Sequence, residues 1–215
     1  MQLLLLLMAF LLPPELGQPF LSEEITGGHK AKPHSRPYMA LLQFLGEKSW
    51  KRCGGVLTQK DFVLTAAHCG GSSMSVTLGA HNIKQQERTQ QVIQVRRAIR
   101  HPEYNPKTFS NDIMLLQLER KAKQTAAVKP LSLPRAKARE AELTVQADRV
   151  CETLYPSHYS RATQICVRDP RKAKTGFKVM VHGTFSYGTM NGIPPGVFTQ
   201  VSHFLPWIKR AMKCL

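Results

Sequence analysis

The chain has 215 residues, with 30 Lys and Arg against 14 Asp and Glu, and its formal net charge is +16. With 42% hydrophobic residues, 14 Gly and 14 Pro, the composition excludes a disordered polycation and a collagen-like or low-complexity chain. The sequence therefore indicates one or two basic globular domains with a substantial apolar core.

The first element is an unbroken apolar run from Leu3 to Leu12, closed by Pro13 and Pro14. A run of this length is too short to span a membrane as a helix and is typical of the core of a secretory signal. The alternative is a buried N-terminal helix. We expect a signal peptide over residues 1–22, and we expect no membrane span because no other apolar run is as long.

The next part of the chain contains short apolar or alternating runs separated by Gly, Pro, Asn and polar clusters. Such closely spaced runs predict short strands and an all-β sandwich or barrel. The expected strands are Tyr38–Phe44, Gly55–Leu57, Phe62–Leu64, Ser75–Leu78, Gln91–Ile99 and Ile113–Leu118.

A basic, Pro-containing stretch from Lys121 to Arg139 follows and is typical of a connection between two halves. The second half has fewer strand-like runs, and these are Glu142–Val145, Gln164–Val167, Val181–Ser186 and Val197–Val201. The chain ends differently, because Phe204, Trp207, Ile208 and Met212 recur at helical spacing behind Ser202, a suitable N-cap. We therefore expect a C-terminal helix.

The five cysteines become disulfide candidates if the chain is secreted. They are Cys53, Cys69, Cys151, Cys166 and Cys214. Because five is odd, at least one thiol stays free or pairs with another chain. We expect no metal site, since the sequence has neither a Cys-x-x-Cys pair nor two histidines at helical spacing.

Basic residues concentrate in three stretches, Arg96–Arg100, Arg120–Arg139 and Arg168–Lys178. A solvated surface and a polyanion-binding surface both remain open. Nucleic acid is not expected, because no helix-turn-helix, RNP or zinc-finger pattern accompanies the charge. For a secreted protein, a sulfated proteoglycan is the expected polyanion.

Two residues point to catalysis. His68 lies just past an apolar strand, and Asp112 lies at the start of another. A buried Asp that accepts a hydrogen bond from one ring nitrogen of a His fixes the tautomer, so the other nitrogen can act as a general base for a hydroxyl nucleophile. Each residue alone is more often structural, and the pair together suggests this chemistry.

Longer stretches carry a resemblance. They are Gly27–His29, Lys32–Ala40, Lys51–Gly55, Thr65–Cys69, Leu78–Asn82, Phe109–Lys123 and Val201–Lys209. Over nearly its whole length the chain resembles the trypsin/chymotrypsin-type (S1) serine proteases of the granzyme branch. The resemblance implies an all-β chymotrypsin-like fold of two six-stranded Greek-key barrels with the site between them, followed by a C-terminal helix.

The resemblance also implies a domain organisation. Residues 23–24 would be an acidic activation dipeptide, and residues 25–215 the peptidase domain. Within that domain, residues 25–120 would form the first barrel, and residues 121–215 a truncated second barrel with the C-terminal helix. Localisation would be the secretory pathway, in cytolytic granules or outside the cell.

Site residues follow from the resemblance as well. His68 would be the catalytic base and Asp112 its orienting carboxylate, and Cys53–Cys69 and Cys151–Cys166 would be family disulfides. Substrates would be proteins or peptides, bound without a cofactor. The expected substrate-binding residues are Thr175, Gly176, Ser186, Gly188 and Gly196. In the family, the serine at the position of Ser186 lines the cleft and donates to the catalytic Asp, so we do not expect it to act as a nucleophile.

The family's nucleophile motif, Gly-Asp-Ser-Gly-Gly, does not occur in this sequence, where Lys178 runs directly into Val179. The nucleophilic serine, an oxyanion-hole N–H and the aspartate that receives the new N-terminus would all leave with it. One lost oxyanion donor alone costs roughly 10²–10³ in rate. A second gap falls between Arg139 and Glu140, where the family has a cysteine-containing strand.

Three hypotheses remain open from the sequence. The first is a protease homologue that is inactive because the serine is missing. The second is a non-enzymatic cationic protein that binds proteoglycan or acts as an antimicrobial. The third is a splice form that does not fold. In each, Cys214 is the unpaired cysteine and a candidate for an intermolecular disulfide.

Overall fold

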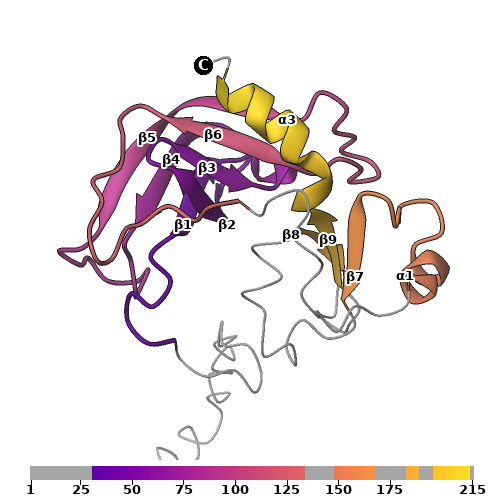
Figure 1. Ribbon diagram of the computed structural model, residues 1–215, viewed down its shortest axis with the longest axis horizontal. Coiled ribbons are helices and arrows are strands. Elements are labelled where there is room, and N and C mark those ends of the chain that lie inside the picture. Colours follow the sequence, from indigo (N-terminus) through magenta and orange to yellow (C-terminus); the bar gives the residue numbers. More distant parts are fainter. Residues whose placement is uncertain (1–30, 134–147, 168–182, 189–195, 214–215) are drawn as a thin grey trace, which may run out of the picture.

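The computed structural model describes residues 31–133, 148–167, 183–188 and 196–213. These residues form a closed six-stranded barrel, a separate three-stranded sheet and a long C-terminal helix (Figure 1). The expected all-β, chymotrypsin-like class with a C-terminal helix is confirmed.

The barrel is formed by the first half of the chain. Its strands are β1 (Met39–Leu45), β2 (Trp50–Gln59), β3 (Phe62–Thr65), β4 (Ser72–Leu78), β5 (Gln91–Arg100) and β6 (Met114–Leu118). They follow the order β1-β2-β3-β6-β5-β4, and all neighbours are antiparallel. All six predicted strands are confirmed, and closure leaves the barrel without a free edge.

The barrel interior is one continuous apolar cluster. Along β1, alternate side chains point inward, so that Ala40, Leu42 and Phe44 are buried. They meet Leu57, Leu78 and other inward-facing side chains from the remaining strands.

Strand β2 begins five residues before the start that we predicted, Gly55. Residues Trp50–Gly54 are mostly exposed, and the charged Lys51 and Arg52 interrupt any apolar run. They extend the strand because they pair in register with β1, with Leu45 opposite Trp50 and Leu42 opposite Cys53. The backbone pairing is a tertiary effect that the local sequence does not encode.

The connection after the barrel runs as irregular backbone from Glu119 to Leu133 and lies against the barrel surface. The N–H groups of Ala122, Lys129 and Leu131 donate to backbone carbonyls of the β2–β3 turn, the segment before β1 and β2, respectively. Val128 is fully buried in the barrel cluster. The predicted connection is confirmed as far as Leu133, and its later part lies outside the described residues.

The second half contributes α1 (Arg149–Leu154) and the strands β7 (Gln164–Val167), β8 (Gly183–Gly188) and β9 (Gly196–Gln200). The sheet order is β7-β9-β8, and both pairings are antiparallel. Three of the four predicted strands are confirmed, and the fourth, Glu142–Val145, lies outside the described residues. Helix α1 was not predicted, since six residues are too few to show a helical period.

The C-terminal helix α3 (Val201–Lys213) follows β9 directly but packs against the first barrel (Figure 1). Its Phe204, Leu205 and Ile208 meet Leu64 and Leu115, which point out of the barrel. The prediction of Ser202 as N-cap is wrong, because the helix already begins at Val201, which we had assigned to the preceding strand.

Two disulfides are present, Cys53–Cys69 and Cys151–Cys166. The first joins β2 to the turn that follows β3, and the second joins α1 to β7. The pairing implied by the resemblance is therefore confirmed. Within the described ranges, every helix is too short or too polar to cross a bilayer.

Candidate active site

His68 lies in a single 3-10 turn, η2 (Ala67–Cys69), just after β3. Three bonds hold this turn in place. Thr65 donates its hydroxyl to the carbonyl of Gly54 at 2.8 Å, Cys69 is bonded to Cys53, and the backbone N–H of His68 donates to Asp112 Oδ1 at 2.9 Å. These bonds fix the backbone of His68 and so limit the directions in which its ring can point.

Asp112 lies two residues before β6 at the end of a strained loop. Phe109 and Asn111 both have left-handed backbones, with φ of 54° and 55°. Asn tolerates this region, whereas a bulky aromatic residue rarely adopts it. The loop buries the Asp112 side chain completely, and the hydroxyl of Thr184 on β8 donates to its backbone carbonyl at 3.3 Å.

The two side chains form a direct pair. Nδ1 of His68 lies 2.8 Å from Oδ2 of Asp112. Because an ionised carboxylate only accepts, Nδ1 donates, and Nε2 is left with its lone pair. The His68 side chain is 31% exposed while that of Asp112 is 0% exposed. Asp112 is buried and holds the ring of His68, while Nε2 is left free to act as a general base.

Aromatic rings line one side of the pair. The Phe109 ring meets the edge of His68 at 5.9 Å between centroids, and Tyr187 on β8 meets Phe109 at 5.8 Å. Tyr155 in turn contacts Tyr187 at 5.2 Å. Burial raises the pKa of Tyr187 to about 12, so the wall is neutral at physiological pH. The wall connects the first barrel to the second sheet.

On its other side His68 borders an open hollow of about 610 Å³ lined by the loop that follows β5. Arg100, His101 and Tyr104 are among its polar side chains. Burial lowers the pKa of His101 and raises the pKa of Tyr104, and the carboxylate of Asp112 raises the latter further. His101 also packs on Phe204 and Trp207 of α3.

One cluster has the residue types of a metal site. The sulfurs of Cys53 and Cys69 and a ring nitrogen of His68 lie within 4.8 Å of one another. However, the two sulfurs are joined in a disulfide, so they offer no thiolate. The Nδ1 of His68 is already used by Asp112. These residues therefore do not fit a metal ion in the oxidised chain.

The structure places the predicted substrate-binding residues on two neighbouring strands where it describes them. Gly188 on β8 and Gly196 on β9 face each other in register. Ser186 is buried, and its hydroxyl bonds with Thr199 Oγ1 at 2.8 Å. The hydroxyl of Ser186 thus bonds to Thr199 rather than to Asp112 as the resemblance implies, and Thr184, two residues earlier on the same strand, donates to the backbone carbonyl of Asp112. Thr175 and Gly176 lie outside the described residues.

Sequence reasoning missed the groups that surround the pair. Three groups interact with the His68–Asp112 pair: Thr184 through a hydrogen bond, Tyr104 electrostatically and Phe109 through its ring. Phe109 lies three residues before Asp112, which is the one local signal that could have identified it. Tyr104 lies eight residues before Asp112 without a local signal, and Thr184 comes from a segment far away in the chain that only the tertiary fold brings in.

Comparisons with known proteins agree with this geometry. The Trypsin family model matches residues 25–150. Granzyme H from Homo sapiens is 59% identical over 250 aligned positions that cover 100% of both chains. Cathepsin G from Homo sapiens is 48% identical, with 99% of this chain and 95% of that protein covered. A solved structure titled "Structure of GrC" superposes with a TM-score of 0.78 at 44% identity, over 87% of this chain and 99% of the other.

The alignment with granzyme H also measures what is missing. It extends over 250 positions, whereas this chain has 215 residues, so at least 35 aligned positions have no residue in this chain. Because both chains are covered from end to end, the gaps are internal.

Proposed function

Because the chain belongs to the Trypsin family of serine proteases, we propose that it is a granzyme-type endopeptidase homologue that keeps the His–Asp half of the catalytic triad and has lost peptidase activity. One observation carries the proposal. His68 and Asp112 pair at 2.8 Å, while the sequence contains no Gly-Asp-Ser-Gly-Gly motif to supply the nucleophile.

The base has nothing to activate without that serine. In the triad mechanism the histidine takes the proton of a serine hydroxyl as it attacks the scissile carbonyl. Loss of any triad member leaves only residual catalysis from binding and the oxyanion hole, and this chain also lacks the glycine and serine that would form the hole. Ser186 does not replace the nucleophile, because it is buried and bonded to Thr199.

A fluorophosphonate probe tests the proposal, since it labels a serine only when an activated hydroxyl is present. We expect no labelling of the purified chain under conditions that label granzyme H to completion. Labelling that disappears in the His68→Ala variant would overturn the proposal. Labelling that is equal in both would indicate modification unrelated to the pair.

Peptide binding is the part of the family function that we propose to persist. Gly188 and Gly196 pair beside the aromatic wall, and Thr175 and Gly176 would complete a primary pocket with no charged side chain. Such a pocket favours large aromatic or aliphatic side chains over Lys, Arg or Asp. A panel of fluorescently labelled peptides without a reactive group, differing in one side chain and titrated by fluorescence anisotropy, would measure the preference.

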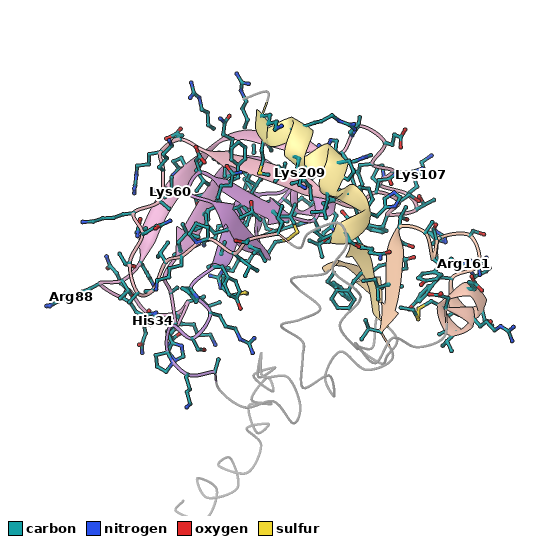
Figure 2. The ribbon with its side chains drawn as sticks, viewed as in Figure 1. His34, Lys60, Arg88, Lys107, Arg161 and Lys209 are labelled. Atoms are coloured by element: carbon teal, nitrogen blue, oxygen red, sulfur yellow. A yellow bond between two sulfur atoms is a disulfide. The ribbon has the colours of Figure 1, made fainter. Side chains whose placement is uncertain are left out.

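The surface charge favours a second role, as a ligand for sulfated proteoglycan. Arg96, Arg97 and Arg100 on β5 are exposed, and so are Arg120, Lys121 and Lys123 at the end of the neighbouring strand. Lys60, Arg88 and Lys209 are exposed as well, and Arg88 points away from the molecule in Figure 2. Retention on heparin well above physiological salt supports this role, and elution at physiological salt would contradict it.

The cellular setting belongs to the same proposal. Two disulfides indicate folding in an oxidising compartment, which agrees with a signal peptide at 1–22, an activation dipeptide at 23–24 and delivery to granules or the cell exterior. Cys214 is the one cysteine outside these two pairs and is our candidate for an intermolecular bond. Non-reducing electrophoresis of the Cys214→Ser variant tests it, since the variant should lose any dimer.

A further inference from the structure

The tip of the β1–β2 hairpin, residues Leu45–Arg52, is an unusual part of the barrel surface. Leu45 and Trp50 are direct cross-strand partners, and the loop between them is closed by a hydrogen bond from Gly46 N–H to the Ser49 carbonyl at 2.9 Å. Leu45 is 37% exposed and Trp50 is 63% exposed. Two large apolar side chains therefore stand side by side at an exposed tip.

Strand alternation explains why they face solvent. Phe44, one residue before Leu45, points into the barrel core and is buried. Leu45 and its partner Trp50 must then lie on the outer face, since successive side chains of a strand point to opposite sides. Nothing in the fold requires apolar residues there, because polar side chains would satisfy the same pairing.

Basic residues flank this apolar pair along the hairpin, with Arg52 on the same face of β2 as Trp50 and Lys51 on the opposite face. Lys48, Lys51 and Arg52 are all exposed, and Glu47 is the only acid between Leu45 and Arg52. Lys48 lies in the loop itself, and Lys51 and Arg52 follow Trp50 along β2. The tip thus combines an indole ring and a leucine with a local charge of +2.

We infer that this hairpin tip binds the surface of anionic lipid bilayers, with Trp50 and Leu45 entering the interface and Lys48, Lys51 and Arg52 contacting the headgroups. Tryptophan favours the membrane interface because its ring is apolar and its N–H needs a partner. Each base near an anionic surface adds attraction. A sulfated polysaccharide would use the bases but has no place for a leucine beside an indole.

The consequence concerns the position of the active-site pair. Arg52 precedes Cys53, whose disulfide reaches Cys69 next to His68. A chain bound through the tip would hold the His68 turn close to the bilayer. The inference is independent of the proposed function, because it rests on the first barrel and holds whether or not a nucleophile is present.

Vesicle sedimentation tests the inference. We expect the full chain to bind vesicles of phosphatidylcholine and phosphatidylserine (7:3) and to bind pure phosphatidylcholine vesicles weakly. Trp50→Ser should lower the partition coefficient by about tenfold. The triple variant Lys48→Gln, Lys51→Gln, Arg52→Gln should lower it by about 100-fold.

Matched controls distinguish binding through the tip from the general effects of net charge and of exposed apolar side chains. Val92 is 55% exposed on β5, so Val92→Ser removes a comparable apolar side chain elsewhere. Arg88, Lys107 and Arg161 are exposed at other sites (Figure 2), so their triple Gln variant removes the same charge. We expect both controls to bind almost as the parent does. Heparin retention should be unchanged in Trp50→Ser, which distinguishes lipid from polysaccharide.

Fluorescence gives a second readout. The chain has two tryptophans, Trp50 and Trp207, and Trp207 packs against His101. In Trp207→Phe, we expect the emission of Trp50 to shift to the blue and to be quenched by brominated lipid on vesicle binding. Binding that Trp50→Ser leaves unchanged, absence of quenching, or equal losses in the tip and control triple variants would each overturn the inference. Capture of a protein partner by the tip with no vesicle binding would overturn it as well.

Discussion

The first barrel and the second sheet of this molecule are tied by disulfides of almost equal span, 16 and 15 residues, but they differ in their cores. In the barrel, one buried cluster draws on all six strands. Among the described residues of the sheet region, the buried residues form two small clusters, Cys151 with Cys166 and Val197, and Val167 with Phe198. Within the part of the chain that the structure describes, similar crosslinks therefore accompany different amounts of apolar packing.

This difference indicates which part of the fold holds the active-site residues in place. His68 and Asp112 both come from the barrel, so their geometry rests on a closed, well-packed unit. The sheet contributes Tyr187 and the hydroxyl of Thr184. We therefore expect the pair to survive changes that loosen the sheet.

The largest effect should come from the apolar cluster between the barrel and α3. Leu115 is fully buried between the barrel and α3, so Leu115→Ala should lower the free energy of unfolding by about 4 kcal/mol through lost burial and a residual cavity. Val167→Ala in the sheet should cost only about 1 kcal/mol. Urea unfolding followed by circular dichroism measures both. Equal losses would mean that the two halves share one core.

Removal of the second disulfide should have the next largest effect. A loop of this size contributes roughly 3 kcal/mol in the chain-entropy model. In the double variant Cys151→Ala and Cys166→Ala, we expect hydrogen exchange to quicken in α1 and β7–β9 while β1–β6 stay protected. The matched variant without Cys53 and Cys69 should instead loosen the turn that carries His68. Uniform exchange across the chain in either variant would contradict local stabilisation.

A smaller effect is expected from the hydroxyl that joins the two halves. Thr184→Val removes the donor to the carbonyl of Asp112 and should cost about 1 kcal/mol, because the carbonyl keeps no partner from β8. Thr153→Val is the control, since its hydroxyl bond stays within exposed α1. If both variants melt at the same temperature, the bond does not couple barrel and sheet.

The smallest effect should appear at alkaline pH. Burial raises the pKa of Tyr187 to about 12 and also raises the pKa values of Tyr155 and Tyr159. The neutral phenols are favoured in the folded chain. Their contribution to the free energy of unfolding is therefore complete below the ordinary pKa of 10 and is lost as the pH rises toward 12. Absorbance at 295 nm measures the titration, and Tyr187→Phe should remove the step near pH 12. A Tyr187 titration centred near pH 10 would contradict this.

The sequence predicted the barrel well because each of its strands is bounded by turn residues and faces a core on one side. The extension of β2 and the pairing of α3 with the barrel were not predictable, since Lys51 and Arg52 carry no strand signal and the partners of Phe204 lie far away in the chain.

In the site, His68 and Asp112 were identified from their neighbours along the chain, but the groups around them were not. Thr184 bonds to the backbone of Asp112 and Ser186 bonds to Thr199. The register shift between Phe185 and Tyr187, where β8 pairs with β9, is a property of the paired sheet that the local sequence does not show. The left-handed backbone of Phe109 was equally hidden, since bulky residues seldom adopt it.

The packing of α3 on the first barrel has a consequence for synthesis on the ribosome. The six barrel strands are complete once residue 118 has emerged, but Leu64, Ile113 and Leu115 stay uncovered until Phe204, Leu205 and Ile208 arrive. During the intervening translation, the nascent barrel exposes this apolar strip. This strip on the outer surface of the barrel is therefore fully buried only after the thirteen residues of α3 have been translated.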